Sequence, residues 1–313
     1  MIHLASVAGL ERVTWSQGNL IVAFLPQLGG KLCTLRRKSR ARNVLYEPHD
    51  LPYRLPEQDG VFEDHDTSGF DECFPTVDAC PDPRMPTRRL PDHGAVWSRP
   101  VTWSVDGEVL SMVSDLPGAR FSRTFRVEGD TLVLGYSVMV EESGPALWSA
   151  HPLLAVSEGS RIYLPSEVAS LYVQWSSDGH LGERGAVCAW PGQDATRIDH
   201  VAGRSAGRAK KLFTDALRAG WCAIVDGDSG EAVTFRFDPA DTPFLGLWIC
   251  EGGWPRSRAA KHHTVALEPC SGRPDALDEA ARRKECWWLD AGIPRTWSLR
   301  VGLSDGFPSE LTV

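Results

Sequence analysis

The sequence lacks long apolar runs and the short motifs that mark several common enzyme classes. No stretch approaches the ~18 consecutive apolar residues of a membrane-spanning helix, and the opening residues MIHLASVAGL carry no basic segment before their apolar positions. We therefore expect a cytoplasmic protein that does not bind membranes. P-loop, G-x-G-x-x-G and G-x-S-x-G motifs are absent as well, which disfavours nucleotide binding and serine hydrolysis.

No C-x-x-C pair occurs among the 8 cysteines, so the sequence indicates neither a zinc ribbon nor a thioredoxin-like site. Cys73 and Cys80 are close enough in sequence to bridge a loop in an oxidising compartment, but reduced thiols are expected in the cytosol. His262 and His263 are adjacent, and neighbouring residues of a strand point to opposite faces, so they do not chelate one ion together. We expect no metal and no cofactor.

Positive charge is in the minority, with 33 Lys and Arg against 41 Asp and Glu and a formal net charge of -8. Nucleic-acid backbones are held by clustered basic residues that release counterions, so this balance argues against a nucleic-acid partner. Two basic clusters, at 31–42 and 204–211, are interpreted as solvated loops or outer strand faces, because neither contains aromatic stacking residues.

Helical patterns are almost absent: only Pro274 to Lys284 reads as a helix, while short β-rich runs recur along the chain. Asp106-Gly107 is a hairpin turn signal, and Asp290-Ala291-Gly292 predicts a second hairpin at the end of the chain. Residues 48–91 show no sustained period and are expected to form a long functional loop. These features predict an all-β fold, a two-sheet antiparallel β-sandwich, as a single domain over residues 1–313.

Three residues are candidates for chemistry. Glu268 follows a strand-like alternation and precedes Pro269, which ends a central ladder, and a carboxylate among apolar residues is costly unless it is paired or functional. A structural ion pair with an arginine is the alternative. His93 lies in P-D-H-G-A-V-W and His151 in W-S-A-H-P-L-L; a loop hydrogen bond and an interior position are their respective structural alternatives.

Taken in order, P-D-H-G with a following tryptophan, H-P-L-L, and A-L-E-P-x-x-G-x-P-D-A-L resemble the landmarks of the aldose 1-epimerase (galactose mutarotase-like) family. L-G-G-K-L-x-x-L near the start and F-L-G-L-W-I followed by Gly252-Gly253-Trp254 fit its bacterial branch. Each motif alone is weak, and their order over nearly the whole chain makes the resemblance specific.

The resemblance implies a β-supersandwich that binds a hexose in a broad cleft. It implies that Glu268 takes the proton from the anomeric hydroxyl, that His151 protonates the ring oxygen, and that His93 binds the sugar near that oxygen and assists. Opening a hemiacetal ring requires a base and an acid that face the same carbon, and no cofactor. Four tryptophans are candidates for contact with sugar C–H groups: Trp97, Trp148, Trp248 and Trp254.

The chain departs from the family where studied members carry an Asn-Arg pair before the first histidine. The corresponding region reads G-F-D-E-C-F-P, so Asp71 and Glu72 are candidates for hydroxyl recognition, with loop capping as the alternative. Asp215 and Asp241 are candidates for the family's central aspartate.

The sequence thus predicts an aldose 1-epimerase-like isomerase acting on a hexose or hexose derivative, with a small sugar as its only expected partner. A carbohydrate-binding or regulatory protein that has lost the chemistry on the same scaffold is the main alternative. A glycosidase or lyase is the third, and it requires a second carboxylate roughly 5–10 Å from Glu268.

Overall fold

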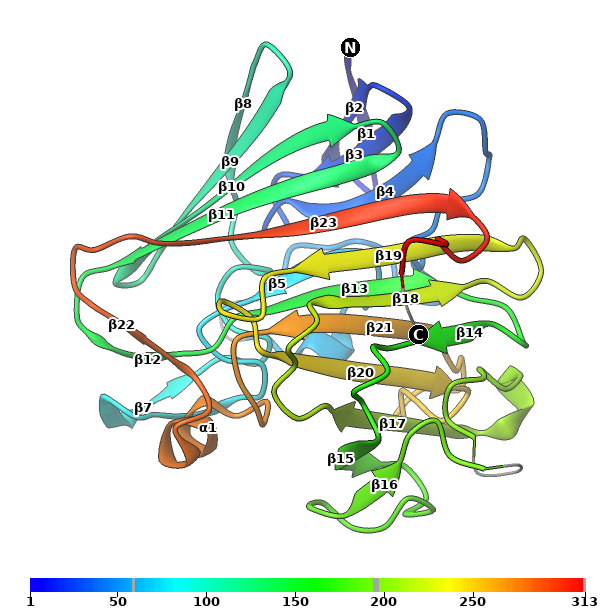
Figure 1. The fold of residues 1–313 in the computed structure, drawn as a ribbon. Coiled ribbons are helices and arrows are strands. Elements are labelled where there is room, and N and C mark those ends of the chain that lie inside the picture. The colour runs from blue at the N-terminus through cyan, green and yellow to red at the C-terminus, as the bar shows by residue number, and fades with distance from the viewer. Residues whose placement is uncertain (58–59, 194–196, 312–313) are drawn as a thin grey trace.

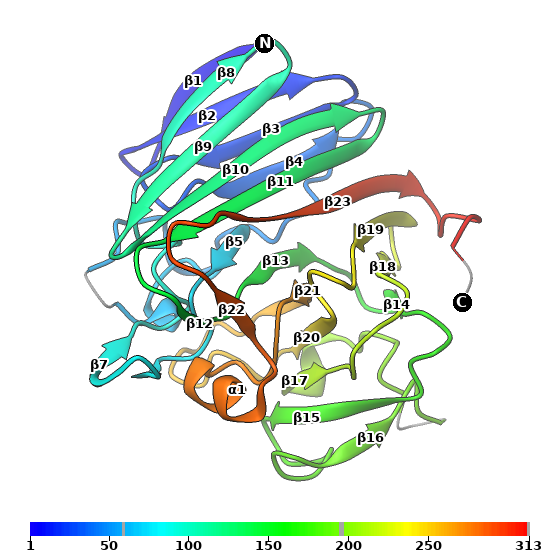
Figure 2. The ribbon, with the colours of Figure 1, turned by 60° about the vertical axis from the view of Figure 1, so that its left-hand side comes forward.

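Two large antiparallel sheets pack face to face, as Figures 1 and 2 show from two sides. The protein is described by a computed structural model over residues 1–57, 60–193 and 197–311. The all-β sandwich predicted from the sequence is confirmed, and within the described residues α1 (Leu277–Arg283) is the only α-helix. It lies inside the segment from Pro274 to Lys284 that was predicted to be helical.

The larger sheet has 11 strands and includes the H-P-L-L, A-L-E-P and F-L-G-L-W-I segments that resemble the epimerase family. In spatial order they are β1 (Ile2–Val7), β2 (Leu10–Gln17), β3 (Leu20–Leu25), β4 (Lys31–Arg37), β5 (Phe70–Cys73), β13 (Ser149–Ala155), β21 (His263–Cys270), β20 (Phe244–Glu251), β17 (Arg208–Phe213), β15 (Ser170–Ser176) and β16 (Val187–Ala189).

The smaller sheet has 8 strands and packs on one face of the larger one. In spatial order they are β14 (Arg161–Tyr163), β18 (Trp221–Val225), β19 (Glu231–Phe237), β23 (Arg295–Asp305), β11 (Thr131–Val140), β10 (Ala119–Glu128), β9 (Val109–Leu116) and β8 (Thr102–Asp106). Two small ribbons pair β6 (Cys80–Asp82) with β7 (Met85–Leu90) and β12 (Gly144–Ala146) with β22 (Trp287–Leu289).

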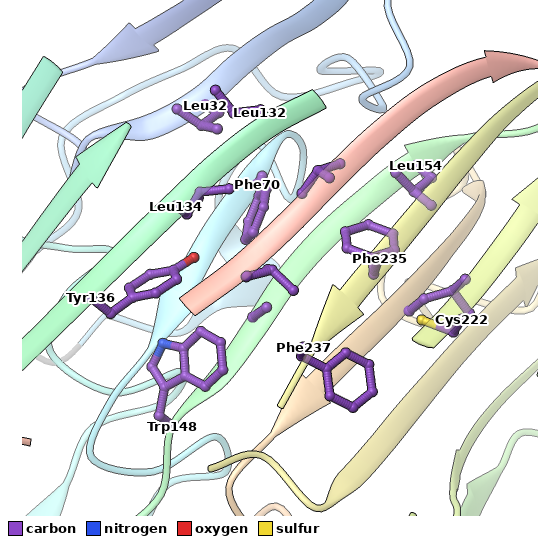
Figure 3. Packing of buried hydrophobic residues seen from close by; sticks show 14 of the residues in the cluster. Leu32, Phe70, Leu132, Leu134, Tyr136, Trp148, Leu154, Cys222, Phe235 and Phe237 are labelled. Carbon is purple, nitrogen blue, oxygen red and sulfur yellow. The ribbon is translucent and has the colours of Figure 1, made fainter. Parts of the chain in front are cut away.

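The main hydrophobic core fills the space between the two sheets. On β11 alternate residues point into it, as Figure 3 shows for Leu134 and Tyr136, and Phe70 of β5 and Phe235 of β19 lie in the same core. On β21 the same alternation sends Leu267 into this core and leaves Glu268 on the opposite, outer face of the larger sheet. The outer face is therefore where the candidate site is built.

Two local predictions were wrong. Residues 48–91 are not a continuous loop, because they contain the 3₁₀ turn Phe62–Asp64, strand β5 within the larger sheet, and the β6–β7 ribbon. The last two strands do not form a hairpin either: β22 pairs with β12, and β23 pairs with β11 and β19. The turn Asp290-Ala291-Gly292 reverses the chain, but long-range pairing takes each strand to a different partner.

All eight cysteines are free, including Cys73 and Cys80. Among the described residues, no helix has both the length and the apolar character to cross a membrane.

Candidate active site

A cleft of ≈ 470 Å³ opens on the outer face of the larger sheet, a size within the ~300–1,000 Å³ typical of small-molecule sites. Its walls include the three residues proposed for chemistry, Glu268, His93 and His151. These side chains are 58, 117 and 175 positions apart in sequence, so the fold brings them together. The other charged or aromatic residues of the walls are Phe62, Glu63, Asp78, Asp92, Trp175, Arg184, Lys211, Trp248, Trp254 and Asp275.

Strand register explains why the two strand residues meet. The pairing of β13 with β21 joins Leu153 to Ala266, and continuing this register places His151 opposite Glu268. Directly opposite residues of antiparallel strands have Cβ atoms ~4.5–5.5 Å apart. On the other side of β21, Glu268 is paired with Gly246 of β20, which has no side chain to fill the space beside the carboxylate.

Glu268 is 1% exposed and lies at the base of the cleft. Its Oε2 accepts a hydrogen bond from Nζ of Lys211, while its Oε1 has no hydrogen-bond partner among the described residues. Burial raises the pKa of Glu268, and the nearby ammonium of Lys211 partly offsets that rise. An acceptor that is buried and unpartnered at the base of a cleft suits a hydroxyl group of a ligand.

Lys211 links two carboxylates of the cleft. Its Nζ bonds Glu268 and lies 3.6 Å from Oδ1 of Asp275. Burial alone would lower the pKa of Lys211, but the charges of Asp275 and Glu268 outweigh it and raise the pKa. Lys211 therefore stays protonated and provides the positive charge that a buried carboxylate pair requires.

The interpretation of the two basic clusters as solvated was wrong for three of their four lysines, since Lys31, Lys210 and Lys211 are buried and only Lys38 is exposed. Lys211 and Lys210 are both buried in β17, and Lys210 forms an ion pair of 2.9 Å with Glu251. Lys31, in the other cluster, is 2% exposed and bonds Asp66 at 2.5 Å. Each buried lysine has an acidic partner from a distant segment, which neighbouring residues in the sequence do not reveal.

His93 occupies the rim loop and is held by contacts on two sides. Its backbone is left-handed (φ 57), a conformation that costs a non-glycine residue on the order of 1–3 kcal/mol and persists only where the surroundings impose it. The ring stacks on Phe62 with centroids 4.0 Å apart, and Nδ1 lies 2.9 Å from Oδ1 of Asp92. Burial acts to lower the pKa of His93, but the Asp92 carboxylate outweighs it, so the pKa is raised.

His151 has the opposite electrostatic environment. Its ring meets that of His93 edge to face with centroids 4.9 Å apart, and its buried Nδ1 has no hydrogen-bond partner in the part of the chain that the structure describes. Burial lowers the pKa of His151 well below its usual value, and the positive charges of His93, Lys211 and Lys31 lower it further. Of the two imidazoles, His93 is therefore protonated more readily than His151.

Asp78 and Asp275 add two carboxylates to the walls. Burial, followed by the nearby charge of Asp275, raises the pKa of Asp78 to about 6. Asp275 comes from the P-D-A-L segment that follows Glu268 in the sequence. The earlier candidates for a central aspartate lie elsewhere: neither Asp215, which bonds Arg273 at 2.9 Å, nor Asp241, which lies 3.4 Å from Arg295, lines the cleft.

The structure corrects the predictions for Glu72 and Trp148. Glu72 is adjacent to Asp71 on β5 and points the other way, into the core between the sheets, where it accepts hydrogen bonds from Tyr136 at 3.0 Å and from Trp148 at 2.9 Å. Trp148 precedes His151 by three positions, and in extended chain an odd spacing places two side chains on opposite faces. Both residues are buried core residues outside the cleft walls.

Asp71 and Trp97 also lie outside the cleft walls. Asp71 is paired with His151 in the strand register and faces Nζ of Lys31 at 3.1 Å. Trp97 is 3% exposed and donates from Nε1 to the carbonyl oxygen of Asp92 at 2.8 Å. In this structure both residues contact the loop and strand that carry the histidines, and their contact with a ligand stays a prediction.

Trp248 and Trp254 do line the cleft, and so does Trp175, which the sequence did not single out. A tryptophan in an S-L-Y-V-Q-W strand is most simply interpreted as core, and only the irregular register of β15 against β17 between Val173 and Trp175 turns it outward. The described residues contain no group of three His, Cys, Asp or Glu side chains arranged to hold a metal ion.

No protein-family model matches the chain, and no curated protein matches it in sequence. Solved structures do match. A galactose mutarotase-like protein from Lactobacillus casei is 15% identical with a TM-score of 0.67, over 94% of this chain and 100% of that one. A proposed aldose 1-epimerase from Escherichia coli K12 is 17% identical with a TM-score of 0.66, over 97% of this chain and 99% of that one.

A galactose mutarotase-like protein from Clostridium acetobutylicum gives a similar match, with 12% identity, a TM-score of 0.67 and coverage of 97% of this chain and 98% of that one. These matches cover nearly the whole chain and agree with a β-sandwich of two antiparallel sheets. More narrowly, the chain has the galactose mutarotase-like fold, as its resemblance to the aldose 1-epimerase family implied.

Proposed function

We propose that the protein interconverts the α and β anomers of a hexose or hexose derivative by opening and reclosing the sugar ring. The observation that carries this proposal is the meeting in one cleft of Glu268, whose Oε1 has no hydrogen-bond partner among the described residues, and two imidazoles whose pKa values are shifted in opposite directions. Ring opening needs an acceptor for the proton on O1 and a donor for the ring oxygen. The cleft supplies both from protein side chains.

In the proposed mechanism, Glu268 takes the proton from the anomeric hydroxyl while an imidazolium gives a proton to the ring oxygen, and the bond from C1 to that oxygen breaks. Rotation about C1–C2 in the open aldehyde, followed by the reverse transfers, closes the ring with the other configuration. The resemblance implied that His151 is the acid. The opposite pKa shifts of the two histidines favour His93 as the resident proton source, with His151 beside it as its relay partner.

Replacing Glu268 with Gln tests the proposal, because it removes the base and keeps the shape. We expect the catalysed anomer exchange of glucose and galactose, followed by polarimetry or by NMR, to fall roughly 10²–10⁴-fold, the range of a general base. Glu251→Gln is the matched control: Glu251 is also a buried glutamate paired with a β17 lysine, at 2.9 Å, but it does not line the cleft. Equal rates for Glu268→Gln and the unchanged protein contradict the assignment.

A specific observation keeps the glycosidase alternative in consideration, since Asp275 shares the Lys211 ammonium with Glu268. Such an enzyme uses two carboxylates about 5–10 Å apart. Aryl glycosides separate the two functions, because their anomeric oxygen is blocked and an anomer-exchanging enzyme cannot open them. Release of the aryl alcohol identifies a glycosidase, and binding of free sugar without faster anomer exchange identifies a binding protein.

A further inference from the structure

The cleft continues past the acid/base groups along a wall of three half-buried tryptophans. The rings of Trp175 and Trp248 stack with centroids 5.7 Å apart, and Trp254 meets Trp248 edge to face, also at 5.7 Å. The rings come from β15, from β20 and from the segment after β20. Half-buried aromatic rings in a cleft offer apolar area to a ligand at low entropic cost.

The strand order places the far end of this wall beyond the reach of one sugar ring. Trp248 pairs with Lys211, and Lys211 pairs with Trp175, so β15 lies three strand spacings from β21, or about 14 Å. A base must come within hydrogen-bond reach of the proton it removes. The strand that carries Trp175 is therefore separated from the strand that carries Glu268 by more than the width of one pyranose ring.

A polar acceptor lies at this end of the cleft. Gln174 lines the cleft, is 7% exposed, and its Oε1 is buried with no hydrogen-bond partner among the described residues. Native proteins rarely leave a buried amide oxygen unpaired, so a missing partner indicates a group that the protein alone does not supply. A ligand hydroxyl provides that hydrogen bond.

The neighbouring tryptophan ring is held in place from outside the cleft. The guanidinium of Arg256 lies 5.1 Å from the centroid of the Trp175 ring, and Nη2 of Arg256 donates to the carbonyl oxygen of Ser177 at 2.9 Å. Cation–π contact and the second anchor restrict the ring before any ligand arrives. Restricting a binding surface in advance lowers the entropic cost of association.

We propose that the substrate is a reducing disaccharide or oligosaccharide, an inference that rests on the proposed anomer exchange. Its reducing ring occupies the Glu268 end, since the reaction needs a free anomeric hydroxyl. The next unit is joined through another hydroxyl of that ring and lies on Trp175 and Trp248, with Gln174 accepting a hydrogen bond from it. The tryptophan wall is thus a second sugar subsite.

The test compares kcat/KM for anomer exchange of glucose with that of cellobiose, maltose and lactose. At least one disaccharide is expected to exceed glucose tenfold or more. In Trp175→Ala, and separately in Gln174→Ala, this ratio is expected to fall to within about twofold of one. Trp288→Ala is the matched control, because Trp288 is 64% exposed and outside the cleft walls, and the ratio should not change. Circular dichroism melting verifies that each variant is folded.

The outcomes separate the subsite from the reaction. The second subsite is overturned if the unchanged protein exchanges glucose faster than every disaccharide. It is also overturned if a preference for a disaccharide over glucose survives in both Trp175→Ala and Gln174→Ala. Either result leaves the proposed function intact. If no sugar is exchanged faster than in buffer, the proposed function fails. Tryptophan fluorescence quenching then decides the subsite alone: tighter binding of a disaccharide than of glucose, lost in Trp175→Ala, supports it, and equal affinities overturn it.

Discussion

At the scale of single residues, the protonation of the two imidazoles depends on one neighbouring carboxylate. Asp92 lies 2.9 Å from the ring of His93 and raises its pKa, while His151 has no hydrogen-bonded carboxylate among the described residues, and its pKa falls. Two titratable groups whose environments move their pKa values apart are the usual basis of paired acid and base roles. Asp92 is therefore a positioning residue for the proposed proton donor.

Replacing Asp92 with Asn should shift the pH dependence of anomer exchange. In the proposed mechanism anomer exchange requires protonated His93, so we expect activity to be lost as the pH rises through the pKa of His93, which lies above the ordinary 6.5 in the unchanged protein. Without the Asp92 charge, burial remains as the dominant influence and lowers that pKa. In a plot of kcat/KM against pH, we expect the fall in activity at high pH, the alkaline limb, to begin at a lower pH in Asp92→Asn. The rate of uncatalysed anomer exchange is measured at each pH and subtracted.

Asp64→Asn is the control for this shift, since Asp64 is an exposed carboxylate at the end of the 3₁₀ turn that begins with Phe62, and it is not the hydrogen-bonded acidic partner of His93. Asp92→Glu retains the charge and should restore part of the alkaline limb. An unchanged limb in Asp92→Asn would show that His93 is not the group whose proton is needed.

The sequence identified candidate site residues that stand in motifs resembling the epimerase family. It did not identify residues of the cleft whose contacts come from segments far away in the sequence. Glu268, His93 and His151 each stand in a short motif, and the structure places all three in one cleft. Lys211 has no such motif, and its importance comes from a carboxylate 57 positions away. Asp78 was missed for the same reason, because its raised pKa depends on burial and on Asp275.

At the scale of elements, β20 leaves room for the Glu268 carboxylate because it carries a glycine beside it. Gly246 lies beside Glu268 in the strand register, and a Cβ at this position would come within 3.0 Å of Oε2 of Glu268 and 3.2 Å of the Phe213 ring. The missing side chain lets Lys211 reach across β20 to the carboxylate on β21. Gly246 therefore positions the proposed base without touching a ligand.

Gly246→Ala is expected to displace the Glu268 carboxylate and to reduce kcat for anomer exchange at least tenfold. The overpacked site should cost roughly 1–3 kcal/mol of unfolding free energy, measured by urea denaturation. Gly302→Ala is the matched strand control, because its Cβ would meet nothing nearer than 3.5 Å, and alanine in a strand is favoured over glycine by about 0.5–1 kcal/mol. Full activity in Gly246→Ala would contradict the positioning role.

Secondary-structure elements marked by a motif in their own sequence were predicted correctly. The positions of strands that depend on pairing with residues far away in the sequence were not. The hairpin at Asp106-Gly107 forms between β8 and β9 as its turn dipeptide indicated. The closing strands separate, because β23 completes the smaller sheet between β11 and β19. Strand β5 has only four residues, and its place between β4 and β13 is not encoded in its own pattern.

At the scale of the whole molecule, a buried ion pair ties the two sheets together behind the cleft. Nη1 of Arg123, on β10 of the smaller sheet, lies 3.4 Å from Oε1 of Glu72 on β5 of the larger sheet, and both side chains are 1% exposed. Arg123 alternates with the core residues Phe121 and Phe125 on β10, and its pairing with Glu72 explains a charged side chain on that face. Sandwich architecture was predictable from the strand patterns, but which strands face one another across the core was not.

Replacing Arg123 with Met should weaken this connection strongly. Breaking a buried pair by removing one partner leaves an uncompensated charge on Glu72 and typically costs 3–5 kcal/mol, so the urea midpoint is expected to fall by the corresponding amount. Arg120→Met, on the same strand, is the control: its pair with Asp115 is 57% and 78% exposed and is expected to contribute no more than ~1 kcal/mol.

The double variant Arg123→Met with Glu72→Gln should recover much of the lost unfolding free energy, because it removes the unpaired charge of Glu72. Equal midpoints for Arg123→Met and Arg120→Met would mean that the sheets are held together by apolar packing alone.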